Sequence, residues 1–213
     1  NCSFCHGHKR APRRMNSDEF SLVLDKISGL TEYIYYHLMG EPLTHPDLPD
    51  FIKTATKRGF KSIITTNGTL LGKHGDKILS AGVHKVNISL HSFEKGSDAD
   101  HESYVVSLAE FAKKAAENGV ITVFRLWNKG FDSGKNVSSI EILKEHILGE
   151  WAENTRGIRI REKIYLEYGD RFEWPDISAE YKGESVEFHA TGMVTFPLLG
   201  TKAEIADKIA FDP

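Results

Sequence analysis

The feature that most constrains the fold of this chain is a regular alternation of short apolar runs with helical stretches. The runs are rich in β-branched and aromatic residues and predict strands over residues 32–39, 60–65, 83–90 and 120–127. Apolar residues at helical spacing predict helices over residues 16–29, 48–59, 71–80, 100–118 and 138–148. Strands and helices that alternate with short loops are typical of parallel strands joined by right-handed crossovers. We therefore predict an α/β protein with a parallel sheet.

The pattern changes near residue 155. Residues 158–166 still indicate a strand, whereas residues 168–192 are rich in charged and aromatic side chains without a helical period. A short helix is predicted near the end, over residues 203–209. We therefore expect a core domain over residues 1–155, with the last strand of that core and an appendage in residues 156–213.

Composition excludes several classes of partner. The chain has 213 residues, enough for one domain or one domain with an appendage, and its formal net charge is −3. No overall positive field therefore favours a nucleic acid or an anionic membrane. No apolar run approaches the ~20 residues of a membrane span, and we expect no secretory signal before the cysteines. With two cysteines, close together in sequence, we expect a cytoplasmic protein whose thiols act as ligands.

Both cysteines lie in the first eight residues, which read NCSFCHGH. Thiolates three positions apart can point at one metal ion or cluster from a single turn of backbone. The pattern alone leaves four interpretations. Cys2 and Cys5 could be half of a zinc site completed by His6 or His8, a redox dithiol, part of an iron–sulfur loop, or two inert buried thiols.

Ligands bind at the carboxyl ends of the strands in parallel α/β folds. The residues at the predicted strand ends include Gly40, Glu41, Asn67, Ser89 and Arg125. Gly40 and Asn67 equally fit ordinary turns. Glu41 lies between a glycine and a proline, where it can accept hydrogen bonds from an ammonium or hydroxyl group. Arg125 is a cation in an apolar strand and needs either a protein carboxylate or an anionic ligand.

Several short pieces, taken in order, resemble the radical S-adenosylmethionine superfamily. They are CSFC at residues 2–5, GEPL and THPDL at 40–48, TNGTL at 66–70 and NISL at 87–90. The resemblance covers residues 1 to about 128. It implies a partial (β/α)6 TIM-like barrel, with a [4Fe–4S] cluster and S-adenosylmethionine as cofactors.

The resemblance also implies roles for single residues. Cys2 and Cys5 match the second and third cysteines of the family's C-x3-C-x2-C cluster loop, and Phe4 matches the aromatic residue that lies against the adenine. Gly40 and Glu41 match the segment that binds the amino group of the methionine moiety.

Three further positions match the family farther along the chain. Ser89 matches a polar strand-end position near the ribose, and Arg125 a cation that meets the methionine carboxylate. Asn67 matches a turn of the family and is grouped with the cofactor-binding residues. We expect the side chains of Glu41, Ser89 and Arg125 to open onto one cavity.

The chain also departs from the family pattern. The first cluster cysteine would lie four residues before Cys2, so we expect these 213 residues alone to lack the opening strand, to be inactive and to leave Cys2 and Cys5 without metal. Met39 stands where glycine is commoner. No cysteine follows Cys5 that could bind an auxiliary cluster.

The resemblance implies an oxidoreductase-like enzyme. An external electron donor would drive cleavage of S-adenosylmethionine, and the resulting 5'-deoxyadenosyl radical would abstract hydrogen from a substrate. Because the first step needs no general acid or base, no catalytic side chain is assigned. The substrate class suggested by the breadth of the family is a peptide or protein. The alternative is a non-catalytic α/β domain in which Cys2, Cys5 and His6 or His8 hold a structural zinc ion.

Overall fold

A computed structural model describes residues 13–37, 40–93, 97–132 and 134–170, and its centre is a seven-stranded sheet. The strand order is β1-β2-β3-β4-β7-β6-β5. The strands are β1 (Tyr33–Tyr36), β2 (Lys61–Thr66), β3 (Lys85–Ser89), β4 (Ile121–Leu126), β5 (Ala152–Asn154), β6 (Gly157–Arg161) and β7 (Ile164–Tyr168). Strands β1, β2, β3, β4 and β7 pair in parallel. This confirms the predicted α/β class and the parallel sheet expected of a partial (β/α)6 barrel.

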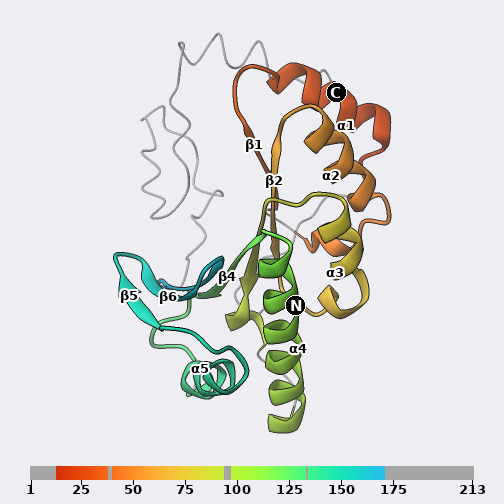
Figure 1. Cartoon of the computed structure of the whole chain (residues 1–213). Coiled ribbons are helices and arrows are strands. Elements are labelled where there is room, and N and C mark those ends of the chain that lie inside the picture. Colours follow the sequence, from red (N-terminus) through yellow and green to blue (C-terminus); the bar gives the residue numbers. More distant parts are fainter. Residues whose placement is uncertain (1–12, 38–39, 94–96, 133, 171–213) are drawn as a thin grey trace, which may run out of the picture. The chain divides into compact units, whose positions relative to one another are not determined.

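One helix precedes the first strand, and the others lie in the connections between the parallel strands. The helices are α1 (Ser17–Ile27), α2 (Leu48–Lys57), α3 (Leu71–Ser80), α4 (Asp98–Glu117) and α5 (Lys135–His146), with the 3-10 helices η1 (Pro42–Thr44) and η2 (Leu90–Ser92). Helices α1 to α4 follow one another along one face of the strands (Figure 1). No helix in the described ranges is long and apolar enough to cross a membrane.

The core lies between these helices and the sheet. Side chains alternate between the two faces of a strand, and those of Ile64, Val86, Ile88 and Phe124 belong to one large buried cluster with residues of α3 and α4. The alternate positions of β2, β3, β4 and β7 form what we call the second face. It consists of Lys61, Ile63, Thr65, Lys85, Asn87, Ser89, Ile121, Val123, Arg125, Tyr165 and Glu167. Eight of these eleven side chains carry a polar or charged group, so the second face is chemically unlike the helix side.

An antiparallel hairpin extends the sheet after α5. Strands β5 and β6 pair with each other, and β6 pairs antiparallel with β7. The run of apolar residues at 158–166 is therefore two strands, with a turn at residues 162–163 between them. The division of the chain near residue 155 stays a prediction.

The ends of several elements differ from the sequence prediction. Helix α4 begins at Asp98, two residues earlier than predicted, because Ser97 and Asp100 form a capping box that pins its first turn. The third strand ends at Ser89, because residues 90–92 turn into η2. Both differences are local, and they leave the order of the elements unchanged.

Contact between α3 and α4 depends on a glycine. A Cβ atom added at Gly75 would lie 2.8 Å from Cδ2 and 2.9 Å from Cε2 of Phe111, which is buried. We expect Gly75→Ala to lower the free energy of unfolding by about 1–3 kcal/mol, the usual cost of overpacking, although alanine favours a helix by about 1 kcal/mol. Urea denaturation measures this.

Gly72→Ala is the matched control, because it lies in the same helix and an added Cβ meets nothing within 4 Å. It should raise stability by up to about 1 kcal/mol. Equal stability of the two variants would contradict the packing of α3 on α4.

Candidate functional site

Ser89 and Arg125 lie side by side at the carboxyl ends of their strands. They are register partners in the parallel pairing of β3 with β4, and Arg125 is in turn the partner of Glu167 in β7. The three residues therefore form a row across the second face. Ser89 caps the start of η2 without a side-chain hydrogen bond to that helix, so its hydroxyl is not used by the cap.

Arg125 finds its protein partner in Glu167. Its Nε atom lies 3.4 Å from Oε2 of Glu167, and both side chains are mostly buried, with 15% and 18% exposed. The guanidinium also lies over the ring of Trp127, 4.4 Å from the ring centroid. The buried Nε–H makes no directed hydrogen bond within the described part of the chain. Arg125 is thus held by charge and stacking, with a donor still unsatisfied.

The positive charge of Arg125 affects, and is affected by, the titratable groups around it. Burial lowers the pKa of Arg125, and the Glu167 carboxylate opposes that shift. The pKa of His37 is also lowered, first by burial and then by the positive charge of Arg125. His37 is therefore neutral at pH 7, and Arg125 stays charged because no shift of this kind deprotonates a guanidinium.

Glu41 ties the loop after β1 to the end of β2. Its Oε1 accepts hydrogen bonds from the Leu43 N–H (3.1 Å) and the Thr66 hydroxyl (2.7 Å), and its Oε2 accepts from the Asn67 N–H (2.9 Å). A carboxylate offers about four acceptor sites, so Oε2 retains one for a further donor. The carboxylate is therefore an organising group of this edge as well as a candidate ligand.

Asn67 is engaged in a turn. Its Oδ1 accepts from the backbone N–H (2.9 Å) and the hydroxyl (2.7 Å) of Thr69, and its carbonyl accepts from the Tyr104 hydroxyl (2.6 Å). Gly68 follows with φ +79°, a conformation that favours glycine. Gly40 likewise has φ +98°. Gly40 and Gly68 therefore each allow a turn with positive φ, which is a structural role.

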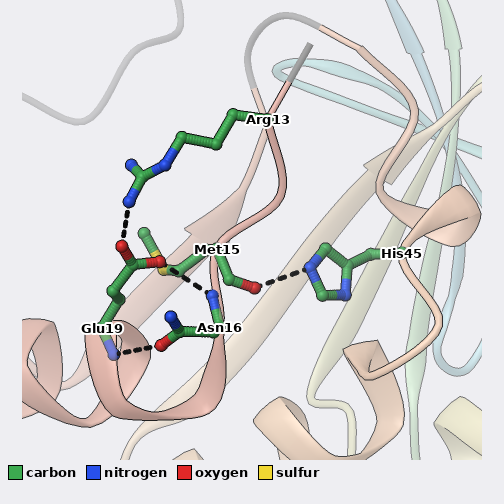
Figure 2. Close-up of polar contacts among 5 residues, drawn as sticks. All are labelled: Arg13, Met15, Asn16, Glu19 and His45. Carbon is green, nitrogen blue, oxygen red and sulfur yellow. Dashed lines mark hydrogen bonds and ion pairs between the residues drawn. The ribbon is translucent and has the colours of Figure 1, made fainter.

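The cluster-loop residues Cys2, Cys5 and Phe4 lie outside the described residues. The described chain begins at residue 13, and its Met15 carbonyl is hydrogen-bonded to His45, which follows Glu41 by four residues (Figure 2). His45 Nδ1 accepts from the Asp47 N–H (3.2 Å), so Nε2 donates to the Met15 carbonyl (3.0 Å). The segment that enters α1 is thereby bonded to the loop that carries the Gly-Glu-Pro motif.

Sequence reasoning brought Ser89 and Arg125 to one place, and it missed three residues beside them. These are Glu167, Lys85 and Asn87, all on the second face. The signal for Glu167 was the alternation of IYLEY, which places a glutamate on the face opposite Ile164 and Leu166. A single cavity shared by Glu41, Ser89 and Arg125 stays a prediction.

Metal ligands do not gather elsewhere in the described ranges. No group of three or more His, Cys, Asp or Glu side chains there could hold a metal ion. The alternative zinc site at Cys2, Cys5 and a histidine falls outside these ranges, and the comparisons with known proteins give it no support.

Curated relatives cover much of this chain. A probable GTP 3',8-cyclase of Sulfolobus acidocaldarius is 31% identical over 177 residues, which are 70% of this chain and 53% of that protein. An AdoMet-dependent heme synthase of Methanosarcina barkeri is 30% identical over 94 residues, 42% of this chain and 27% of that protein. The chain thus spans about half the length of the first relative, and less of the second.

A solved structure titled "Structure of TYW1 with a lysine-pyruvate adduct bound" is also similar. Its TM-score is 0.46 at 20% identity, over 68% of this chain and 57% of that chain. The profile of the family described as Radical SAM superfamily matches residues 1–127, more than half of the sequence. Members of that family use a [4Fe–4S] cluster and S-adenosylmethionine, as the resemblance implied. This chain belongs to the radical S-adenosylmethionine superfamily.

Proposed function

We propose that this chain forms the cofactor-binding core of an enzyme that cleaves S-adenosylmethionine reductively and abstracts hydrogen from a substrate. The observation that carries the proposal is the Ser89–Arg125 pair at the carboxyl edge of a sheet whose sequence matches the family over residues 1–127. When bound, the cluster supplies the electron that cleaves the cofactor into methionine and a 5'-deoxyadenosyl radical.

The described side chains fit the polar groups of S-adenosylmethionine. Arg125 is a mostly buried cation with an unsatisfied Nε–H, and a carboxylate is the anion that a guanidinium binds best. Oε2 of Glu41 can accept one N–H from the methionine amine. Ser89 offers a hydroxyl beside Arg125 for the ribose. Cys2 and Cys5 would supply thiolates to the cluster, and Phe4 would lie against the adenine.

The work of these residues is to bind and orient. Glu41 is fixed by three hydrogen bonds and Arg125 by Glu167 and Trp127, so neither must reorganise when a ligand arrives. No proton transfer by a side chain is required in this step. An external electron donor completes the reaction, and an oxidoreductase-like class follows from it.

The names of the relatives bear on the substrate. Several are GTP 3',8-cyclases, which favours a nucleotide over the peptide or protein that the breadth of the family suggested. The heme synthase among the relatives shows that one fold serves different substrates. We propose a nucleotide as the first substrate class to test.

The cluster assignment is tested by exchanging the cysteines. In the full-length protein that contains this chain, anaerobic reconstitution with iron and sulfide should yield visible iron–sulfur absorption. Cys2→Ser and Cys5→Ser should each remove most of the bound iron, because thiolates are the usual ligands of such clusters. The 213 residues alone, with two cysteines, should hold no four-iron cluster and be inactive.

His6→Ala and His8→Ala are the controls and should keep their iron. Stoichiometric zinc that is lost on exchange of either histidine, with no cleavage of S-adenosylmethionine, would establish the zinc alternative instead.

The role of Arg125 is tested by Arg125→Met. A charge-assisted hydrogen bond is worth about 1.5–3 kcal/mol, so the Kd for S-adenosylmethionine should rise about 10–100-fold, measured by equilibrium dialysis on the reconstituted protein. Iron content should stay the same.

Arg159→Met is the matched control for Arg125→Met. Arg159 is a more exposed arginine on β6 that lies 3.8 Å from Glu150, and its loss removes the same charge from the same sheet. If Arg125→Met and Arg159→Met bind the cofactor equally well, Arg125 does not meet the carboxylate.

A further inference from the structure

Lys85 is a half-buried cation that has no close anionic partner among the described residues. It begins β3 on the second face, and no hydrogen bond or ion pair joins its ammonium to another residue of the described ranges. Burial lowers the pKa of Lys85, and the charges of Arg125 and Arg156 lower it further, while Glu167 raises it. Glu167 already lies against Arg125, so it is shared between two cations. Binding an anion beside Lys85 would therefore lower the free-energy cost of keeping this charge partly buried.

Asn87 lies two residues farther along the same strand and is 1% exposed. Its Nδ2 donates a long bond of 3.4 Å to the Thr65 hydroxyl, and its Oδ1 has no partner within the described part of the chain. Buried amide groups usually have partners at both ends, because an unsatisfied one costs stability.

The two side chains leave the sheet on the same side. Residues i and i+2 of a strand point to one face and their Cα atoms are about 6.6 Å apart. The next alternate residue is Ser89, beside Arg125. Lys85 and Asn87 therefore continue the row of proposed cofactor contacts toward the amino end of β3, away from the strand-end loops.

We propose that Lys85 and Asn87 form the substrate subsite of this face, and that the substrate is a nucleotide whose phosphate meets Lys85 and whose base N–H meets Asn87. The assignment rests on the proposed function, in which Ser89 and Arg125 hold the cofactor. It adds the position of the substrate and the two side chains that recognise it.

A nucleotide fits this pair better than an acidic peptide does. An asparagine amide in a fixed orientation matches the planar donor and acceptor edge of a base. A lysine ammonium binds phosphate as a compact point charge. A nucleotide offers both a phosphate for Lys85 and a base edge for Asn87, whereas an acidic peptide offers no planar base edge.

The experiment is calorimetric titration of the full-length protein with GTP, ATP, tripolyphosphate and a triglutamate peptide. Lys85→Met should weaken nucleotide and tripolyphosphate binding at least tenfold and make the remaining affinity less dependent on salt. Asn87→Leu should weaken nucleotide binding about as much, yet leave tripolyphosphate binding unchanged.

Stability gives a second, independent readout. Because Asn87→Leu replaces a buried, partly unpaired amide by an apolar group of similar size, its Tm should be equal to or above that of the wild type. A residue kept for a structural hydrogen bond would lower the Tm instead. A clear drop in Tm with unchanged nucleotide affinity would overturn the proposal.

Lys61→Met is the matched control for charge. Lys61 begins the neighbouring strand β2 and is paired with Glu32 at 3.1 Å, so its loss should leave nucleotide affinity unchanged. Equal losses in Lys61→Met and Lys85→Met would reduce the effect to general charge and refute the subsite. Tighter binding of triglutamate than of either nucleotide would refute the substrate class.

Binding of S-adenosylhomocysteine separates this inference from the function on which it rests. If Lys85→Met and Asn87→Leu bind S-adenosylhomocysteine normally and also bind nucleotide as tightly as the wild type, the proposed subsite is wrong and the cofactor site is unaffected. If the wild-type protein does not bind S-adenosylhomocysteine, the proposed function fails as well.

Discussion

Parallel hydrogen bonding between β3, β4 and β7 is the constraint on which the site depends. It brings Ser89, Arg125 and Glu167 to one level, although Arg125 and Glu167 are far apart in sequence. A shift of one residue in either pairing would move a charged side chain to the helix side, among Phe124 and Leu166. Burying an unpaired charge there costs several kcal/mol, so the apolar pattern of the strands and the row of charges enforce the same register.

The alternation of apolar runs and helical stretches was enough to predict the α/β class and the element order. It was also enough to place Ser89 and Arg125 at neighbouring strand ends, because parallel strands end at the same edge. The division of residues 157–168 into β6 and β7 escaped prediction, since these residues read as one apolar stretch and the turn at Glu162 and Lys163 carries no glycine or proline. Lys163 adopts φ +65° in this turn, and lysine rarely has a positive φ, so the sequence gives no sign of the turn.

The partner of Arg125 could not be found from sequence for a different reason. Strand pairing across β4 and β7 is a long-range choice, and Glu32, Glu41 or Glu167 were equally available as carboxylates in a linear reading. In the structure Glu41 accepts hydrogen bonds from Thr66 and Asn67. Glu32 forms an ion pair with Lys61, and Glu167 forms one with Arg125. Each choice follows from the order of strands in the sheet, which periodicity alone does not contain.

The distribution of unsatisfied groups separates the two faces of this sheet. Three buried side-chain atoms in the described ranges lack a hydrogen-bond partner, and two of them, Asn87 Oδ1 and Arg125 Nε, lie on the second face. A sheet under selection for stability alone would hold apolar residues at both positions, as Ile63 and Val123 do beside them. Buried polar groups without partners make the free protein less stable. A ligand that supplies the missing hydrogen bonds offsets that cost. The helix side therefore supplies the apolar packing of the domain, and the second face carries unsatisfied polar groups, as its proposed binding role requires.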